Sequence, residues 1–351
     1  MLDARIYRAA LLPVVLAIVV AAFSLENRPH PIGTTLAPDA FVGADARKQL
    51  DAWVARFPDR RPGSAGDEAL AAAIAGQLRA MSKTFQVRTV HFEGETIDGE
   101  RDLTTVLATQ AGAPAPQLVV VAHRDAAGRG AAAELSGTAA MLEIAHAVAD
   151  GRLRRTITFA SVSGGSGGAA GAADLARRLD VPVDAVLVLG DLAGTRVRRP
   201  FVIGWSNSGG SAPLRLQRTV EGALHTELGA DPGDPSARAQ LSQLAFPATV
   251  TEQGELARSG LPAVALSVAG ERGPAAGEPV STPRLQAFGR GALRALFALD
   301  NGPDIAGGPQ SSVVTARKVL PGWAFRLVAF ALLLPLWLVA IDGWARARRR
   351  R

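Results

Sequence analysis

The residues best placed for chemistry are His123, Arg124 and Asp125, which directly follow an apolar run, Leu118–Ala122. A run of this kind is typical of a strand buried on both faces of a sheet. In open α/β sheets, ligands bind at the carboxyl ends of the strands, so these polar residues are expected at a binding site. The His123 side chain could bind a metal ion or could simply hydrogen-bond Asp125, and the sequence leaves both alternatives open.

A second pattern lies at Gly164–Gly168, which reads Gly-Gly-Ser-Gly-Gly between a predicted strand and a predicted helix. It matches the G-x-S-x-G nucleophile elbow, with Ser166 as nucleophile and with Asp191 and His225 following in the order of a serine hydrolase. A Gly/Ser-rich segment produces this pattern easily, and His225 is predicted to lie inside a helix. A serine hydrolase is therefore the less favoured interpretation.

Strands and helices alternate along the main part of the chain. Helices are predicted at 45–57, 67–81, 136–149, 168–179, 214–228 and 282–299, and strands at 85–97, 103–109, 118–122, 156–163, 183–189, 201–205 and 262–268. This alternation predicts an α/β fold, a three-layer sandwich with a mainly parallel central sheet. The chain has no cysteine, which excludes disulfides, thiolate metal sites and a cysteine nucleophile.

Apolar runs and net charge lie at the two ends of the chain. Of the formal net charge of +6, residues 1–8 carry +1 and residues 326–351 carry +5, so residues 9–325 are neutral overall. The main part of the chain therefore has no basic surface excess for nucleic acid, and none is expected as a partner. Apolar runs at 9–23 and 327–341, the second flanked by Trp323 and Trp344 and followed by an Arg-rich tail, predict N- and C-terminal transmembrane helices.

These features predict six segments and a membrane topology. They are an N-terminal anchor or cleavable signal segment (1–25), a linker (26–43), the main domain (44–300), a Gly/Pro-containing linker (301–321), a transmembrane helix (322–344) and a basic tail (345–351). Basic residues beside both apolar runs place both termini in the cytoplasm. A two-pass protein of the cell membrane is therefore expected, with its main domain outside the cytoplasm and the N-terminal segment more consistent with an uncleaved anchor.

The order of several motifs carries a family resemblance. The motifs are PDRRPGSAG (58–66), VVVAHRD (119–125), ELSGTAAMLEIA (134–145), TITFASVSGG (156–165), VLVLGDLAG (186–194) and ARSGLPAVALS (257–267). With these motifs, residues 44–299 resemble the zinc aminopeptidases of peptidase family M28, whose fold is also used by glutaminyl cyclases. The resemblance implies a site in which two zinc ions share a bridging Asp and a Glu acts as general base.

Carried over position by position, the resemblance implies an incomplete site. His123 and Asp191 match ligands of the first metal, and Asp125 matches the residue that orients the His ring. The bridging Asp would stand at Ala133, and the neighbouring Glu134 could substitute only if its loop moved. The Glu pair would stand near Gly165, where residues 156–173 contain no Asp, Glu or His, and no histidine follows His225 to supply the last ligand.

The sequence therefore predicts a membrane-tethered pseudo-peptidase that binds a peptide or another membrane protein. No cofactor is expected, although one zinc ion could bind if the remnant ligands hold it, since a catalytic zinc normally has three protein ligands. The alternative is an active enzyme, either an aminopeptidase with one zinc at His123 and Asp191 or the serine hydrolase at Ser166. His30, His91 and His146 are interpreted as structural or solvent-exposed.

Overall fold

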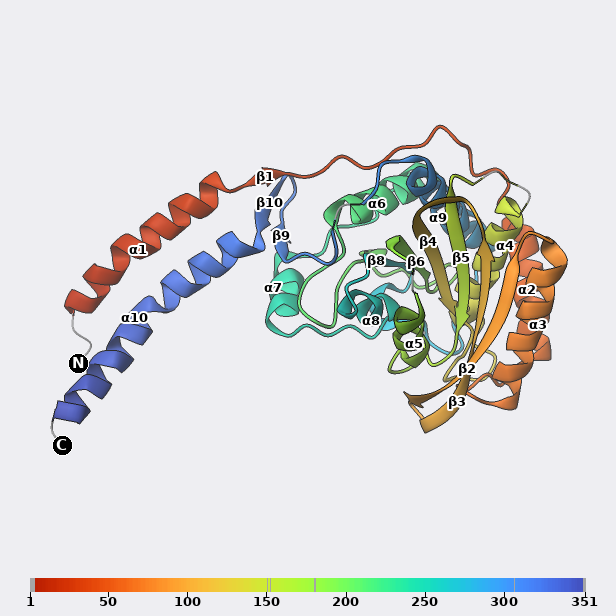
Figure 1. Cartoon of the computed structure of the whole chain (residues 1–351), viewed down its shortest axis with the longest axis horizontal. Helices are drawn as coiled ribbons and strands as arrows, with labels where there is room; N and C mark the ends of the chain where they lie inside the picture. The colour runs from red at the N-terminus through yellow and green to blue at the C-terminus, as the bar shows by residue number, and fades with distance from the viewer. Residues whose placement is uncertain (1–3, 150, 152, 180, 306, 350–351) are drawn as a thin grey trace. The chain divides into compact units, whose positions relative to one another are not determined.

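The computed structural model describes residues 4–149, 151, 153–179, 181–305 and 307–349 (Figure 1). The helices are α1 (Ala4–Phe23), α2 (Gly43–Arg56), α3 (Ala65–Met81), α4 (Ala132–Val148), α5 (Ala170–Arg178), α6 (Leu214–Leu228), α7 (Ala237–Ala245), α8 (Glu252–Arg258), α9 (Thr282–Asn301) and α10 (Gly322–Arg349). The strands are β1 (Glu26–Asn27), β2 (Gln86–Thr96), β3 (Gly99–Gln110), β4 (Ala113–His123), β5 (Arg155–Val162), β6 (Val183–Leu189), β7 (Val202–Ile203), β8 (Ala263–Leu266), β9 (Ser312–Val314) and β10 (Lys318–Pro321).

The described chain divides into two compact units, and the larger one, 29–235 with 245–310, contains the main sheet. Its strand order is β2-β3-β5-β4-β6-β8-β7. The four inner strands β5, β4, β6 and β8 run parallel, while β2, β3 and β7 pair antiparallel at the edges. The expected mainly parallel sheet is therefore a mixed sheet with a parallel centre, and its central strand β4 ends at His123.

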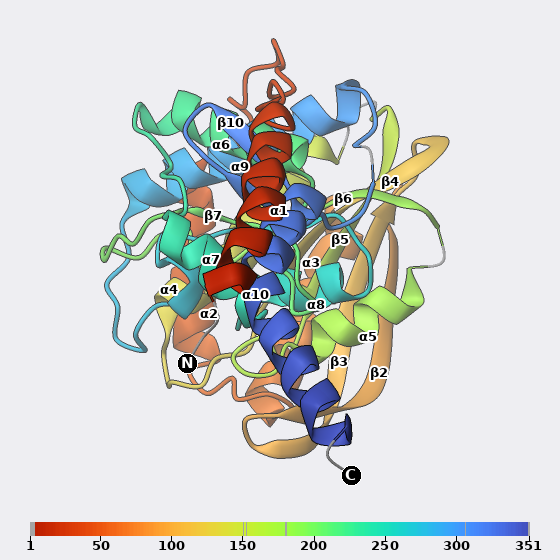
Figure 2. The same ribbon diagram turned by 90° about the vertical axis from the view of Figure 1, so that its left-hand side faces the viewer.

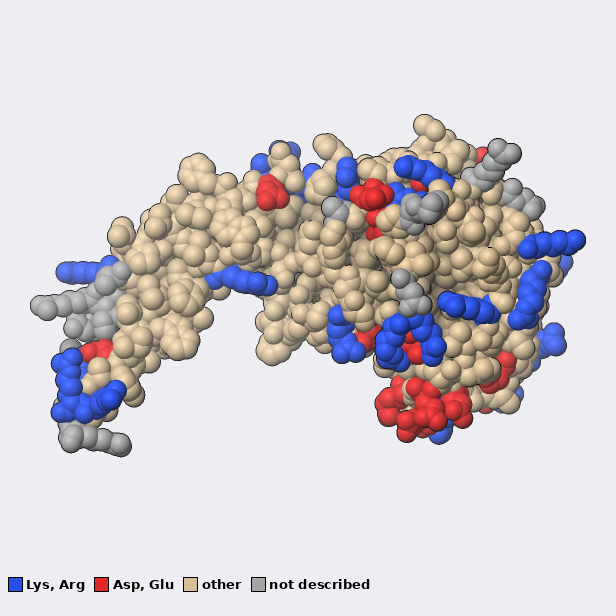
Figure 3. All heavy atoms as spheres, in the orientation of Figure 1, with Lys and Arg blue, Asp and Glu red and all other residues tan. Residues whose placement is uncertain are grey.

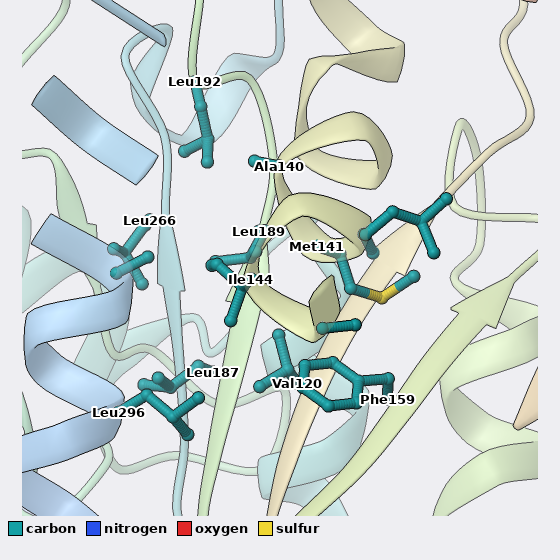
Figure 4. Packing of buried hydrophobic residues seen from close by; sticks show 14 of the residues in the cluster. Val120, Ala140, Met141, Ile144, Phe159, Leu187, Leu189, Leu192, Leu266 and Leu296 are labelled. Atoms are coloured by element: carbon teal, nitrogen blue, oxygen red, sulfur yellow. The ribbon is translucent and has the colours of Figure 1, made fainter. Parts of the chain in front are cut away.

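Both faces of the sheet are covered, which confirms the three layers. Along β4, Leu118 and Val120 face one hydrophobic core and Val119 and Val121 face the other, because successive strand residues point to opposite sides. The first core includes residues of α2, α3, α4, α6 and α9, and the second includes residues of α5 and α8. Figure 4 shows Val120 of β4 in the first core, beside residues of α4.

Close packing of α4 against β6 depends on Gly137. A Cβ atom at this position would lie 2.1 Å from the carbonyl oxygen of Leu189, which no side chain tolerates. The preceding residue, Ser136, consequently reaches the segment that follows β6, where its hydroxyl accepts a hydrogen bond from the backbone N–H of Leu192 at 2.9 Å. The Ser-Gly pair thus fixes the start of α4 beside the carboxyl end of β6.

A buried ion pair fixes the end of β4. The guanidinium of Arg124 is fully buried, and its Nε lies 2.9 Å from the Asp67 carboxylate at the start of α3. The same guanidinium donates to the carbonyls of Ser161 (3.1 Å) and Thr104 (2.7 Å), on β5 and β3. Ser163, after β5, donates to the other Asp67 oxygen at 2.6 Å. One charge pair therefore ties α3, β3 and the end of β5 to the strand that carries His123.

Most sequence-predicted elements of the larger unit are confirmed, although β3 and β4 begin earlier than predicted, at Gly99 and Ala113. Helix α4 begins at Ala132, four residues earlier than expected, so that Glu134 lies in its first turn. Helices α7 and α8 were not predicted, because they have nine and seven residues and lie in a stretch without a long apolar pattern.

The smaller unit consists of residues 1–28, 236–244 and 311–351 as far as they are described, and contains α1, α10 and a three-stranded sheet. Strand β1 pairs antiparallel with β10, so α1 leads into the sheet and α10 leads out of it. The two helices pack against each other, as Figures 1 and 2 both show. Gln240 of α7 binds the backbone of β9 through two hydrogen bonds, to Val314 O and from Val314 N.

The seam between α1 and α10 contains small residues, whereas large apolar residues point outward. The buried residues of the pair are Ala10, Ala17, Ala21, Ala324 and Ala331. The exposed large residues include Leu11, Leu12, Leu16, Phe23, Trp323, Phe330, Leu333, Leu336, Trp337, Ile341 and Trp344. Figure 3 shows a mostly uncharged surface along these helices, with Lys and Arg toward their ends. In length and composition, α10 is suited to cross a membrane.

The expectation of two spanning helices is met only in part. Among the described residues, α10 is the one helix that is long and apolar enough to span a bilayer. The apolar part of α1, Ala10–Phe23, is shorter, because polar and charged residues occupy the start of the helix.

The buried pair at the end of β4 leads to a first prediction. Asp67→Asn keeps the shape of the side chain but leaves the buried Arg124 without a counter-charge, which we expect to cost about 3–5 kcal/mol of folding free energy. Chemical unfolding of the full chain in detergent measures the change. Asp98→Asn, which removes an exposed ion pair with Arg61, is the control and should have a much smaller effect. Equal effects of the two variants would contradict the role given to the buried pair.

Candidate functional site

A cavity of ≈ 380 Å³ lies where the parallel strands end. Four of the sequence-predicted site residues line it: His123 at the end of β4, Glu134 in α4, Ser166 after β5 and Asp191 after β6. Two further carboxylates, Glu252 and Glu255, reach the cavity from α8. The fold therefore brings the predicted residues to one place and adds acidic residues that the sequence pattern did not indicate.

The central contact of the cavity is an ion pair between His123 and Glu252. The Nδ1 atom of His123 contacts a carboxylate oxygen of Glu252, and the side chains are 11% and 3% exposed. Burial alone would lower the pKa of His123, but the nearby Glu252, Asp125 and Glu134 carboxylates outweigh it and raise the pKa from 6.5 to about 10. The ring is therefore a cation at neutral pH.

The absence of a side chain at Gly165 leaves space for the His123–Glu252 pair. A Cβ atom at position 165 would lie 2.4 Å from a carboxylate oxygen of Glu252 and 2.4 Å from Cβ of His123. The space that any side chain at 165 would need is thus occupied by the two partners. A carboxylate stands at this point of the site, but it comes from α8 and not from the loop after β5.

The Asp125 carboxylate is hydrogen-bonded to the glycine-rich loop, and its expected role in orienting the His123 ring remains a prediction. Its carboxylate accepts hydrogen bonds from the backbone N–H groups of Gly165 (3.0 Å) and Ser166 (2.9 Å), and from the Ser166 hydroxyl at 2.5 Å. Asp125 is fully buried, and these three hydrogen bonds hold the glycine-rich loop. The Nδ1 atom of the ring contacts Glu252.

The hydrogen bonds of the described structure do not link the residues of the serine hydrolase interpretation to one another. The hydroxyl of Ser166 donates to Asp125, and the Nδ1 atom of His123 faces Glu252 and not Ser166. His225 lies in α6, where its Nδ1 atom is 3.3 Å from the carbonyl of Ala230. Among the described residues, the hydrogen bonds therefore connect Ser166 to no histidine, and a Ser-His-Asp triad needs such a bond.

Only one of the two carboxylate oxygens of Asp191 accepts hydrogen bonds. Its Oδ1 atom accepts hydrogen bonds from the backbone N–H groups of Ala193 (2.9 Å) and Gly194 (2.7 Å). Its Oδ2 atom is buried and has no hydrogen-bond partner. Burial raises the pKa of Asp191, and the two backbone donors act against that rise. Glu134, on the first turn of α4, has its pKa raised by burial while the nearby His123 acts to lower it.

The residues present do not fit the zinc site that the resemblance implies. Across the described ranges, no three His, Asp or Glu side chains are grouped so that they could hold one ion. The Nδ1 atom of His123 faces a carboxylate, Ala133 stands buried at the bridging position, and Gly165 has no side chain. We therefore assign no step to a metal, and the roles of His123, Asp191 and Glu134 as remnant ligands remain predictions.

Sequence reasoning missed Glu252 because it searched for acidic residues only in the segment after the β5 strand. A signal was present in the sequence: Thr251 is followed by Glu252 and Glu255, and acidic residues after a Thr are typical of a helix start. Nothing in the sequence shows, however, that this helix start lies against the end of β4.

The ion pair leads to a second prediction. Glu252→Gln should bring the pKa of His123 from about 10 back toward its ordinary value, because the main counter-charge is lost. A group whose pKa is raised on folding stabilises the fold fully below its unfolded pKa, about 6.5, and this contribution is lost as pH rises through about 10. The difference in unfolding free energy between the parent chain and Glu252→Gln should accordingly be largest below about pH 6.5 and should decrease toward pH 10.

Histidine NMR titration and unfolding of the full chain at several pH values measure both effects. Glu255→Gln is the matched control, since Glu255 lies on the same helix but is bonded to Asn207 and Arg258. A His123 titration that does not change in Glu252→Gln would show that the pair does not control the ring.

Comparisons with known proteins agree with this fold. Residues 104–242 match the family described as Peptidase family M28. No curated protein sequence matches the chain. Among solved structures, the Legionella pneumophila LapA aminopeptidase is 13% identical, with a TM-score of 0.59, over 76% of this chain and 73% of that one. A glutaminyl cyclase from Porphyromonas gingivalis is 18% identical, with a TM-score of 0.55, over 74% and 98%.

A glutaminyl cyclase from an Acidobacteriales bacterium is 15% identical, with a TM-score of 0.56, over 78% of this chain and 99% of that one. At these identities the structural likeness shows the fold alone. Glu252 lies outside the residues that match the family, in agreement with its origin on α8. Residues 104–242 thus match peptidase family M28, and the larger unit has the fold of its aminopeptidases and of glutaminyl cyclases.

Proposed function

We propose that the chain is a membrane-tethered binding protein, a non-catalytic relative of the M28 peptidases that holds a peptide or a segment of another membrane protein. The observation that carries this proposal is the buried His123–Glu252 pair above Gly165. It occupies the place where a working peptidase of this family would keep its general base. Nucleic acid is not an expected partner, since residues 9–325 are neutral overall.

The chemistry of the pair supports binding over hydrolysis. Amide hydrolysis needs a group that accepts a proton from water and a centre that stabilises the oxyanion. A protonated imidazole has no free lone pair and cannot accept that proton near neutral pH. Glu252 is engaged with the ring, and Asp125 is saturated by three donors of the glycine-rich loop. The volume of the cavity, ≈ 380 Å³, and the charged residues that line it suit the binding of a ligand.

The packing of α1 and α10 supports the membrane tether. In water, two packed helices bury their large apolar side chains and expose small or polar ones. Here alanines form the seam and leucines and aromatic residues face outward. That arrangement is stable where the surroundings are apolar, because lipid covers the large side chains and small residues allow close helix approach. We propose that both helices cross the membrane, with both termini in the cytoplasm and the larger unit outside it.

A third prediction concerns metal and turnover. The full chain in lipid nanodiscs should carry no stoichiometric zinc after incubation at micromolar Zn²⁺, because fewer than three ligands converge. It should not hydrolyse aminoacyl amides or cyclise N-terminal glutamine, yet it should bind members of a short-peptide library saturably. Elemental analysis, product detection and fluorescence anisotropy give the three results.

The controls separate the alternatives. Stoichiometric zinc together with hydrolysis that is lost in His123→Ala would establish a one-zinc aminopeptidase in place of the binding protein. Hydrolysis lost in Ser166→Ala, and retained in His123→Ala, would establish the serine hydrolase. Absence of both turnover and peptide binding would contradict the proposal itself.

A fourth prediction tests whether α1 remains part of the chain and stays packed against α10. Glu26 of β1 pairs with Val319 of β10, and Ala21 and Ala324 each stand five residues from that pair, on the buried seam. Because the chain has no cysteine, a double Ala21→Cys/Ala324→Cys variant reports only on the proximity of these two positions. Mild oxidation in membranes should form the disulfide efficiently. Phe23→Cys/Ala324→Cys, with Phe23 89% exposed, should form much less. Chains that lack α1 after membrane isolation would contradict the two-helix tether.

A further inference from the structure

The starting observation is the burial pattern of the nine-residue helix α7, Ala237–Ala245. Its buried residue is Gln240, which is 3% exposed, whereas the neighbouring Leu241 is 44% exposed. Phe246 directly follows the helix and is 79% exposed. A helix on the surface of a protein in water turns its apolar residues inward and its polar residues outward. The segment 236–246 therefore presents to its surroundings the side chains that are least suited to water.

The exposure of Phe246 sets it apart from the other aromatic residues of the larger unit. In the part of the chain that the structure describes, the remaining exposed Phe and Trp side chains belong to α1 or α10. A single exposed apolar residue is common on protein surfaces, so exposure alone does not identify a contact. The charges beside Phe246 and the position of α7 provide the further evidence.

The exposed side of α7 combines apolar and basic residues. Arg238 and Leu241 are three residues apart, so they lie on one face of the helix, and both are exposed. Residues 235–251 contain no Asp or Glu. Leucine, phenylalanine and arginine without acidic residues are typical of segments that lie in the interface of a membrane. The stem of an arginine can follow the apolar surface there while its guanidinium reaches the headgroups.

Hydrogen bonds hold α7 close to the start of α10. The side chain of Gln240 donates to the carbonyl of Val314 in β9 at 2.8 Å and accepts from its N–H at 2.7 Å. Val314 pairs with Val319 of β10, which precedes Gly322, the first residue of α10, by about 10 Å of strand. Residues 236–244 belong to the same compact unit as β9, β10 and α10, and Figure 1 shows α7 beside β9.

Two residues at the start of α10 mark the boundary between polar and apolar surroundings. Trp323 is 55% exposed, and tryptophan is enriched where a membrane meets water. Arg326 is exposed and donates to the hydroxyl of Ser311 at 3.4 Å, so its guanidinium is directed back toward the segment before β9. A bilayer surface at this level lies within reach of the exposed side of α7.

We propose that α7 and Phe246 form a third contact with the membrane, in which Leu241 and Phe246 insert among the lipid headgroups and Arg238 binds headgroup phosphates. This inference rests on the proposed membrane tether, because α10 has to place the bilayer beside β9. A bilayer suits this surface better than a partner protein does. A specific protein interface needs about 20–30 residues on each side, whereas a segment already tethered to a membrane needs only a few.

The depth of single spin labels in the full chain in nanodiscs tests the proposal. The chain has no cysteine, so Leu241→Cys and Phe246→Cys each carry one label at an exposed position. Oxygen concentrates in lipid and a nickel chelate stays in water, so the ratio of their collision rates with the label reports depth. We expect this ratio to be about threefold or more above that of a control label, because a side chain in the interface is partly removed from water.

Two further positions serve as controls. Val197→Cys is matched in exposure and charge, since Val197 is 46% exposed and stands between Arg196 and Arg198. Trp323→Cys is the reference for a side chain at the membrane surface. An unchanged melting temperature of each labelled chain shows that its fold is kept.

A charge variant tests the part given to Arg238. In nanodiscs in which about a third of the lipids are anionic, the Phe246→Cys label should move deeper than in neutral nanodiscs, with about a twofold higher ratio. Arg238→Gln in the same labelled chain should remove most of this gain, because the positive charge that the anionic surface attracts is lost. A gain that is unchanged in Arg238→Gln overturns the phosphate contact of Arg238.

The remaining outcomes separate this inference from the proposed tether. Labels at 241 and 246 that the nickel chelate reaches as readily as the label at 197, together with lipid contact at 323, overturn the inference and leave the tether in place. Free access of nickel to the label at 323 contradicts the tether as well. Labels at 241 and 246 that neither oxygen nor nickel reaches show burial against protein, which overturns the lipid contact.

Discussion

The site depends on one electrostatic constraint, which is that a histidine ring buried at the end of the central strand must be compensated. His123 stands where β4 meets the cavity, and burial opposes its charged form. A metal ion could use such a ring as a ligand, but here a carboxylate meets it. Glu252 provides that carboxylate from α8, and Gly165 leaves the volume that the pair requires. Breaking such a pair leaves an uncompensated buried group, so the pair also holds α8 at the cavity.

Much of the fold could be predicted from local patterns, and the site could be predicted only where it depends on those patterns. The apolar run before His123, the periodic helices and the turn residues are local signals, and β4, α3 and α6 were placed correctly for that reason. Glu252 could not be assigned because its role is a contact between residues far apart in the chain. The bonds of Asp125 could not be assigned for a related reason: its donors belong to a loop forty residues later, Gly165 and Ser166.

The two helices at the ends of the chain show how composition and packing answer different questions. Composition identifies α10 as long and apolar enough to span a membrane and leaves α1 marginal. Packing adds that Ala10, Ala17 and Ala21 form a seam with Ala324 and Ala331, while large apolar residues face outward. Mean hydropathy averages over all faces of a helix, so it cannot show that the small residues are buried while the large apolar residues are exposed. The position of each side chain around the helix axis carries the information on which the proposed membrane surroundings of the pair rest.

Charge balance links the absent ligands to the ion pair. A two-zinc site needs several carboxylates because each ion carries two positive charges. Alanine at position 133 and glycine at position 165 each remove a carboxylate from that set. What remains is Glu134, Asp191 and Glu252, with the imidazolium of His123 as a single counter-charge in direct contact with one of them. Counted as ionised, Glu134, Asp191, Glu252 and His123 sum to two negative charges, so the imidazolium compensates one carboxylate and forms no direct pair with Glu134 or Asp191.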